Sequence, residues 1–239
     1  MAASFSSPLI RVLKQSLRAA ADPAKAPGMQ AYIKSKMPYL GVSTPVLRET
    51  IRPIFAAHVL ESFEAWRGTI LELWRKARYR EEWYAAIELA GYKPYDEFRT
   101  QLALPVYEEM IVSGAWWDVV DAVATKQLGI LLRKQPRAMA AILRKWAVSD
   151  NIWKRRSAII SQLNFKNQTD LKLLYDCIAP SMGSSEFFLR KGIGWALRQY
   201  ARTDSAEVVR YVLAHESKLS PLTKREALKH CGVQSSKLR

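Results

Sequence analysis

The sequence predicts an all-α fold, arranged as a curved solenoid of about six antiparallel helix pairs. Two observations lead to this class, and a third, the charge, predicts the kind of partner. Apolar residues recur with helical spacing along most of the chain, and no convincing alternating strand pattern interrupts them. Conspicuous residues recur at intervals of 34 to 39 positions. The chain carries 37 Lys and Arg against 22 Asp and Glu, a net charge of +15, which predicts a polyanionic partner, most simply nucleic acid or an anionic membrane surface.

The expected helices begin and end at proline and glycine punctuation. Thr44-Pro45 and Ser220-Pro221 each predict an N-cap followed by a proline in the first turn. Gly114, Pro136 and Gly183 are typical of breaks between helices. We expect helices over residues 5–20, 28–36, 44–58, 61–76, 80–91, 95–112, 115–133, 136–148, 151–164, 169–180, 185–203, 205–215 and 221–231.

The recurrence predicts helix pairs stacked in a HEAT- or armadillo-like manner. Trp83 and Trp117 are 34 residues apart, Asp121 and Arg156 are 35 apart, and Arg156 and Trp195 are 39 apart. A period of this size in an all-helical chain is typical of such stacks. Their concave face, lined with basic residues, could follow a phosphate backbone.

Length and composition predict one domain over residues 1–239, with a frayed tail at 233–239. The chain is 49% hydrophobic, and no Pro/Gly/Ser-rich linker interrupts it. No run of about 18 apolar residues predicts a membrane span. The first 20 residues mildly resemble a transit peptide, but an amphipathic helix with Ile10, Leu13 and Leu17 on its apolar side explains them better.

Cysteine and histidine usage predicts neither a metal nor a cofactor. Cys177 and Cys231 are far apart, and the three histidines show no zinc, iron–sulfur or catalytic-triad spacing. We therefore expect no metal and no cofactor, and a reducing compartment.

The helix within Ser113–Lys134 carries an acid on its apolar side. At about 100° per residue one side of the helix collects Trp117, Asp121, Ala124, Leu128 and Leu131. A buried, unpaired carboxylate costs on the order of several kcal/mol. Asp121 is therefore expected either to bond to a neighbouring helix or to line a cleft in which its charge is used.

A second helix shows the same anomaly with the opposite charge. In Trp153–Phe165 the apolar side formed by Trp153, Ile160 and Leu163 includes Arg156, whereas Arg155 lies on the other side. An acid and an arginine on the apolar sides of successive helical units predict a shared polar cleft.

The helix over 185–203 places an aromatic ring among cations. Its apolar side holds Leu189, Ile193, Leu197 and Tyr200, and Trp195 lies nearly opposite with Lys191, Arg198 and Arg202. Glycine inside a helix destabilises by about 0.5–1 kcal/mol relative to alanine, so Gly192 and Gly194 indicate close approach by another backbone or a ligand. Trp195 is expected either to pack on a neighbouring helix pair or to meet a sugar–phosphate chain or a base.

Residues 29–48 predict a helix, a tight loop and a second helix. Tyr32 lies in the first of these helices. It is expected to face either a cleft or the core, and the sequence does not decide between the two.

With these residues in view, the chain resembles the AlkD-type DNA alkylation repair glycosylases over about residues 29 to 231. The resemblance rests on PYLGV-TP at 38–45, WWDVVD at 116–121, NIWKRRSAI at 151–159, FF-RKGIGWALRQYA at 187–201 and L-KREALKH at 222–230. It implies HEAT-like repeats whose concave basic face cradles duplex DNA. It also implies excision of positively charged N3- and N7-alkylated purines, such as 3-methyladenine and 7-methylguanine, and of bulky adducts, without flipping the base into a pocket.

Matching the motifs residue by residue implies a set of site residues. The catalytic positions would be Asp121, Trp117, Trp195 and Arg156, and Tyr32 matches an active-site tyrosine. The cations of the same two helices complete the residues expected to bind DNA, which are Tyr32, Lys191, Arg198, Arg202 and Arg155. Some relatives that lack these Trp, Asp, Arg and Trp residues are thought inactive. The presence of all four residues in this chain therefore favours an active enzyme.

The chemistry implied is stabilisation of a cationic sugar. An alkylated purine already carries positive charge and leaves readily, so the enzyme must stabilise the oxocarbenium-like deoxyribose. Asp121 is expected to do so and to position or deprotonate the attacking water. Trp117 and Trp195 would form walls against the sugar and backbone, and Arg156 would contact a phosphate.

Two other classes of protein explain the fold and the charge. One is a non-catalytic HEAT-like scaffold that binds DNA or RNA, and the other is a protein–protein scaffold with an acidic partner. Salt-sensitive binding to plain duplex DNA separates the second of these from the rest. The glycosylase interpretation predicts a monomer with duplex DNA as partner, no membrane association, and a cytoplasmic, nucleoid-associated location.

Overall fold

The computed structural model describes residues 7–232, and no strand occurs within that range. The all-α class predicted from the sequence is confirmed for these residues. The expected start of the first helix at residue 5 and the expected frayed tail at 233–239 lie outside them. The chain divides into two compact units, Met1–Val106 and Tyr107–Arg239. The expectations of a single domain and of a solenoid with a basic face stay predictions.

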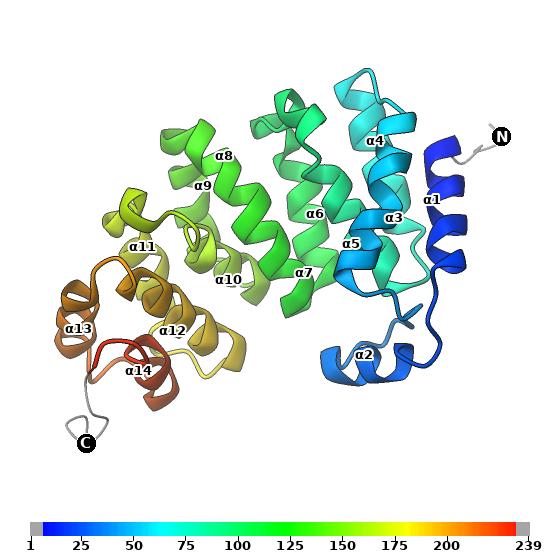
Figure 1. Cartoon of the computed structure of the whole chain (residues 1–239). Helices are drawn as coiled ribbons and strands as arrows, with labels where there is room; N and C mark the ends of the chain where they lie inside the picture. Colours follow the sequence, from blue (N-terminus) through cyan, green and yellow to red (C-terminus); the bar gives the residue numbers. More distant parts are fainter. Residues whose placement is uncertain (1–6, 233–239) are drawn as a thin grey trace. The chain divides into compact units, whose positions relative to one another are not determined.

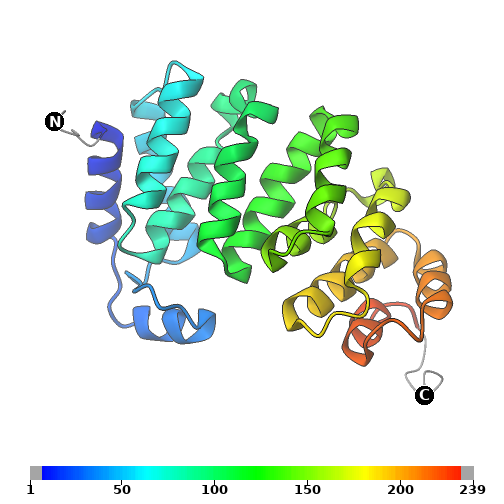
Figure 2. The ribbon, with the colours of Figure 1, turned by 180° about the vertical axis from the view of Figure 1, so that it is seen from behind.

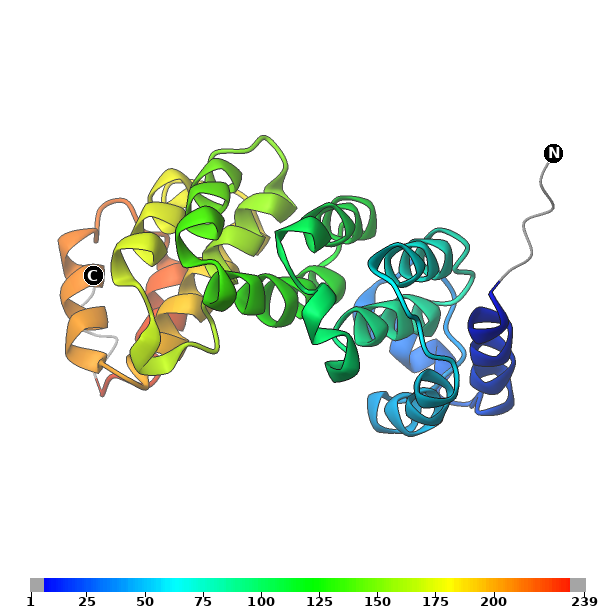
Figure 3. The same cartoon turned by 90° about the horizontal axis from the view of Figure 1, so that it is seen from above.

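Unit 1 is a small helical unit that begins with an amphipathic helix. It contains α1 (Pro8–Ala19), α2 (Ala26–Ile33), α3 (Thr44–Ala57), α4 (Phe63–Arg75), α5 (Arg80–Ala90) and the 3₁₀ turns η1 (Lys93–Phe98) and η2 (Gln101–Ala103). Helix α1 packs on α3 and α5, and α4 packs on α5 (Figure 1) (Figure 3). The side of α1 that is buried carries Leu9, Ile10, Leu13 and Leu17. The amphipathic-helix interpretation of this segment is confirmed.

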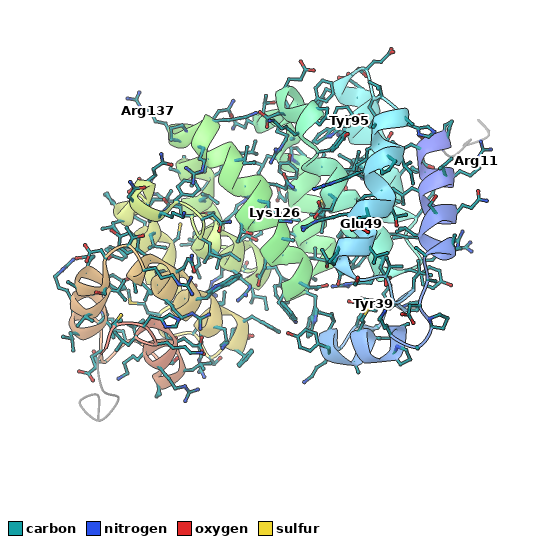
Figure 4. The ribbon with its side chains drawn as sticks, in the orientation of Figure 1. Arg11, Tyr39, Glu49, Tyr95, Lys126 and Arg137 are labelled. Carbon is teal, nitrogen blue, oxygen red and sulfur yellow. The ribbon has the colours of Figure 1, made fainter. Side chains whose placement is uncertain are left out.

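A buried carboxylate explains the PYLGV segment in unit 1. Glu81, fully buried on α5, accepts hydrogen bonds from the backbone N–H groups of Leu40, Gly41 and Val42 at 2.9–3.1 Å. The neighbouring Tyr39, labelled in Figure 4, places its hydroxyl 2.7 Å from that of Tyr84. The loop that follows α2 is therefore fixed to α5 by its own backbone donors.

Unit 2 is the larger unit and carries most of the expected site residues. The boundary falls inside α6 (Leu104–Gly114). The elements that follow are α7 (Trp117–Ala122), the π-helical segment η3 (Val123–Leu128), α8 (Gly129–Lys134), α9 (Pro136–Ala147), α10 (Ile152–Ile160), η4 (Lys166–Gln168), α11 (Leu171–Ile178), η5 (Ala179–Ser181), α12 (Phe187–Ala201), α13 (Ser205–Ala214) and α14 (Pro221–Ala227). Helix α10 packs against α7, α9 and α12, and α12 packs against α13 and α14 (Figure 2).

Two of the predicted helices are interrupted in the structure. The helix expected over 95–112 is divided into η1, η2 and α6, because Pro105 fits only the first turn of a helix that starts at Leu104. The helix expected over 115–133 begins at Trp117, since Ala115 has a positive φ of 38°. It then passes through η3, so its residues do not follow one uniform helical wheel. Ala124, Leu128 and Leu131 are nevertheless fully buried, as the apolar pattern predicts.

None of the helices within residues 7–232 combines the length and the apolar character that a membrane crossing requires.

Candidate functional site

Asp121 and Arg156 form a two-point ion pair in unit 2. Arg156 Nε donates to Asp121 Oδ1 at 2.7 Å, and Nη2 donates to Oδ2 at 2.8 Å. The side chains come from α7 and α10, and only 14% of Asp121 and 6% of Arg156 is exposed. A parallel two-point contact of this kind fixes a carboxylate in orientation as well as in position. The structure thus brings together the acid and the arginine that the sequence placed on separate apolar helix sides.

Arg156 is held from a third side by α12. Its Nη1 donates to the backbone carbonyl of Phe188 at 2.5 Å. The helix that carries it begins in a fixed place, because the Asn151 side chain caps α10 by accepting from the N–H groups of Trp153 and Lys154. All three guanidinium nitrogens are therefore engaged within the protein. The expected contact of Arg156 with a phosphate is a less natural role for this geometry than holding Asp121.

The pKa of Asp121 reflects two opposing effects. Burial raises this pKa above the ordinary aspartate value, and the negative charge of Asp118 adds to the rise. The hydrogen bonds and the positive charge of Arg156 lower the pKa, but they do not fully offset the burial. Asp121 is thus a carboxylate whose ionised form depends on Arg156.

Three aromatic rings pack together beside this pair. The ring of Trp116 lies 6.1 Å from that of Trp153 and 5.2 Å from that of Phe188, and the last two are 5.0 Å apart. Phe188 is also the residue whose carbonyl binds Arg156. The cluster joins α10 and α12 to the start of α7, so it braces the elements that carry the ion pair.

Sequence reasoning missed Trp116 and Phe188. On a continuous helix Trp116 would point to a different side from Asp121. In the structure it is the extended N-cap residue of α7, with φ −151° and ψ 150°. The sequence does contain a hint, the pairs of adjacent aromatic residues at 116–117 and 187–188. Two bulky rings in a row at the start of a helix point in different directions, so one of them can pack on a neighbouring helix.

Trp117 and Trp195 are both partly exposed in unit 2. Trp117 is the first residue of α7, one helical turn before Asp121, so both point to the same side of that helix. Trp195 lies in the middle of α12. The close approach expected at the glycines beside it is made by protein, since a Cβ at Gly194 would lie 3.1 Å from the Thr223 carbonyl oxygen.

The cations expected to bind DNA have different surroundings. Lys191 and Arg198 both pair with Glu226, at 2.9 and 2.7 Å. The hydrogen bond from Lys191 and the nearby positive charges hold the pKa of Glu226 below its usual range. Arg155 donates to the Ser181 hydroxyl and the Pro180 carbonyl. Arg202, at the C-cap of α12, is exposed.

Tyr32 lies in unit 1, on α2, and 76% of it is exposed. The core alternative for this residue is therefore wrong, and its ring is open to solvent.

No group of three or more His, Cys, Asp and Glu side chains among residues 7–232 is placed to hold a metal ion. Cys177 is buried, and burial raises the pKa of its thiol to about 12. It is thus a poor candidate for a nucleophile. The chemistry that the described residues offer at this site is that of a fixed carboxylate beside aromatic rings.

Two comparisons with known proteins find DNA alkylation repair enzymes. The family model described as "DNA alkylation repair enzyme" matches residues 13–231. A solved structure titled "Predicted DNA alkylation repair enzyme from Enterococcus faecalis" is 28% identical and has a TM-score of 0.81; the match covers 90% of this chain and 98% of that one.

A second solved structure shares the fold. The smu.31 protein from Streptococcus mutans UA159 is 18% identical, with a TM-score of 0.58 over 77% of this chain and 90% of that one. The comparison with curated proteins found no match. The family model spans nearly the whole chain, and the chain therefore belongs to the DNA alkylation repair enzyme family, the family that its sequence motifs resemble.

Proposed function

We propose that this protein is a DNA N-glycosylase that excises positively charged N3- and N7-alkylated purines from duplex DNA. The observation that carries the proposal is the Asp121 carboxylate, held by Arg156 on two points and still 14% exposed. The exposed part of Asp121 is open to a ligand, and Trp117 lies one helical turn before it on α7. Membership of the DNA alkylation repair enzyme family supports DNA as the substrate.

The proposed reaction is hydrolysis of the bond between C1′ of deoxyribose and the purine nitrogen. The bonding electrons leave with the base, which is thereby neutralised, and C1′ becomes an oxocarbenium-like cation. The oxygen of a water molecule then bonds to C1′, and the water proton passes to Asp121 or to solvent. The products are a free alkylated base and an abasic sugar, and the balance requires neither a cofactor nor a metal.

Asp121 contributes where the charge develops. A carboxylate fixed before the reaction stabilises the cationic sugar without having to reorient at the transition state. The same oxygens can orient the attacking water or take its proton. Since the base carries its own positive charge, no general acid is needed to make it leave.

Arg156 acts in this proposal through Asp121. Its guanidinium orients the carboxylate and favours the ionised form. We therefore assign it a positioning role in place of the phosphate contact that the motif match implied.

Aromatic and basic side chains would hold the damaged strand. Trp117 and Trp195 offer π faces, which favour cationic character within about 6 Å. The residues expected to contact DNA are Tyr32, Lys191, Arg198, Arg202 and Arg155. Lys191 and Arg198 would leave their ion pairs with Glu226 and bind a DNA phosphate in its place. The affinity for DNA should therefore weaken as the salt concentration rises.

We further propose that excision does not require the base to enter a tight pocket. Contacts to the backbone and sugar of the damaged nucleotide would tolerate a bulky adduct. The test is a duplex with a bulky cationic purine adduct beside one with N7-methylguanine. Excision of both supports the open site, and excision of the methylated purine alone contradicts it.

The decisive experiment is release of free base from a duplex that contains N7-methylguanine. Wild type should release it, Asp121→Asn should not, and both should bind the duplex with similar affinity. The matched control is Asp176→Asn, a half-buried acid of the same unit paired with Arg144 and Lys172, which should keep full activity. Binding without base release by wild type would favour the non-catalytic scaffold.

A further inference from the structure

Gly192 lies inside α12, and Arg156 packs tightly against the point where a side chain at residue 192 would begin. A Cβ atom at residue 192 would lie 3.1 Å from Arg156 Nη1 and 3.7 Å from Arg156 Cγ. The first of these distances is tighter than nine in ten of the contacts that real Cβ atoms make. Glycine is disfavoured inside a helix relative to alanine, and here the missing side chain gives the guanidinium its room.

We propose that Gly192 is a positioning residue, because the absence of a side chain at this point lets the Arg156 guanidinium reach the Phe188 carbonyl and hold Asp121 in its present geometry. Its importance for catalysis rests on the proposed glycosylase function. The geometric part concerns the fold alone and can be tested without activity.

The guanidinium has little freedom to move aside. Only 6% of the Arg156 side chain is exposed, and its nitrogens are held at 2.5–2.8 Å by Asp121 and Phe188. Ile160 also lies near, with its Cγ2 3.8 Å from the Cβ position at Gly192. A methyl group at residue 192 must therefore displace Arg156 by a few tenths of an ångström, which disturbs the bond of Nη1 to Phe188 and, through the rigid guanidinium, the two-point contact with Asp121.

Other glycines separate this effect from general helix packing. Gly194 in the same helix faces Glu226 and Thr223 of α14, so it serves the contact between two helices. Gly68 in α4 is exposed, and a Cβ there would meet nothing within 4 Å. Gly68→Ala is thus the matched control for a glycine-to-alanine change inside a helix.

The first experiment titrates the Asp121 carboxyl by carbon-13 NMR. The charged groups that act on it are Arg156 from α10 and Asp118 from its own helix. Gly192→Ala should raise the pKa of Asp121, because the guanidinium no longer lies close against it, and Gly68→Ala should leave it unchanged. An unchanged pKa in Gly192→Ala would overturn the proposal.

A double-mutant cycle makes the test specific to the guanidinium. Arg156→Ala should raise the Asp121 pKa further, and adding Gly192→Ala to that variant should change nothing, because no guanidinium remains to be displaced. The same shift in both backgrounds would mean that the methyl group acts by another route.

A second variant covers the case in which Gly192→Ala does not fold. Lysine at position 156 has no Nη1 atom, so Gly192→Ala combined with Arg156→Lys should fold. Failure of this double variant to fold, when Arg156→Lys alone folds, would contradict the proposal.

The activity measurement then ties Gly192 to the reaction. Gly192→Ala should lower the single-turnover rate of base release about fivefold to tenfold, since sub-ångström misplacement of catalytic groups is costly, and leave duplex affinity unchanged. If wild type releases no base, the proposed function fails while the NMR result still decides the role of Gly192. A folded Gly192→Ala variant with the wild-type rate would refute the catalytic part.

Discussion

Replacing Arg156 with alanine tests whether the ion pair is as buried as the structure describes. The change leaves the Asp121 carboxylate without its two hydrogen bonds and the Phe188 carbonyl without its donor. Breaking a buried pair from one side costs about 3–5 kcal/mol. Because 14% of Asp121 still reaches water, we expect a loss near the lower end, about 3 kcal/mol in the free energy of unfolding at neutral pH.

The loss should depend on pH with a definite sign. Without Arg156, the pKa of Asp121 in the folded state lies well above its unfolded value, because burial is no longer opposed. The folded state then binds the proton more tightly, so the stability of the variant falls as pH rises through that pKa. The difference between wild type and Arg156→Ala should thus shrink toward acidic pH. Urea unfolding between pH 4 and pH 8 measures it.

Arg144→Ala is the control for this measurement. Arg144 pairs with Asp176 at 2.8 Å, but 42% and 30% of the two side chains are exposed. An exposed pair of this kind contributes under about 1 kcal/mol. A loss for Arg156→Ala that is as small as this, or that does not change with pH, would refute the buried-pair reasoning.

Three further outcomes follow from the structure. Glu81→Gln should lower the free energy of unfolding by about 1–3 kcal/mol. Three backbone N–H groups donate to the Glu81 carboxylate, and the NH₂ group of glutamine cannot accept a hydrogen bond from them. Urea unfolding measures the loss, and an unchanged midpoint would count against the contact. Gly41→Ala should cost about 3 kcal/mol or more, because residue 41 has φ +86° and its Cβ would lie 1.9 Å from a backbone oxygen, whereas Gly28→Ala meets nothing and should be tolerated. As the pH is lowered, the rate of base release should begin to fall above the pH at which an ordinary aspartate titrates, since the pKa of Asp121 is raised. Asp118→Asn should move this fall to lower pH, because it removes a like charge. The measurement is the rate against pH, corrected for spontaneous base loss, and an unmoved profile in Asp118→Asn would contradict the prediction.

Local signals in the sequence predicted the helices well where a proline marks their start. The helices expected at Thr44, Pro136 and Pro221 begin at those residues, and Ser220 is the N-cap of the last, as expected. The N-cap expected at Thr44 is wrong, because Ser43 has the extended backbone that precedes the helix and Thr44 is already helical. Proline has no backbone N–H, so within a helix it fits well only in the first turn. The interrupted helix at 115–133 was not predictable in the same way, because the positive φ of Ala115 and the π-helical segment that follows Ala122 are set by packing.

The candidate site was predicted in its residues but not in its bonding. Asp121 and Arg156 were conspicuous because each places a charge on an apolar helix side. That they bind one another depends on the packing of α10 against α7, and on the Phe188 carbonyl and the space at Gly192 that α12 provides. Those contacts join residues more than thirty positions apart, so helical periodicity does not reveal them.

The most direct test of the central claim is whether Asp121 stabilises a cationic sugar. The measurement compares the affinity of the protein for two duplexes, one with a positively charged pyrrolidine ring in place of one deoxyribose and one with a neutral tetrahydrofuran ring there. We expect wild type to prefer the charged ring by at least about tenfold, as for other mimics of a transition state, and Asp121→Asn to lose that preference while keeping its affinity for the neutral ring. Equal affinity of wild type for the two duplexes, or the same preference in both proteins, would contradict the account.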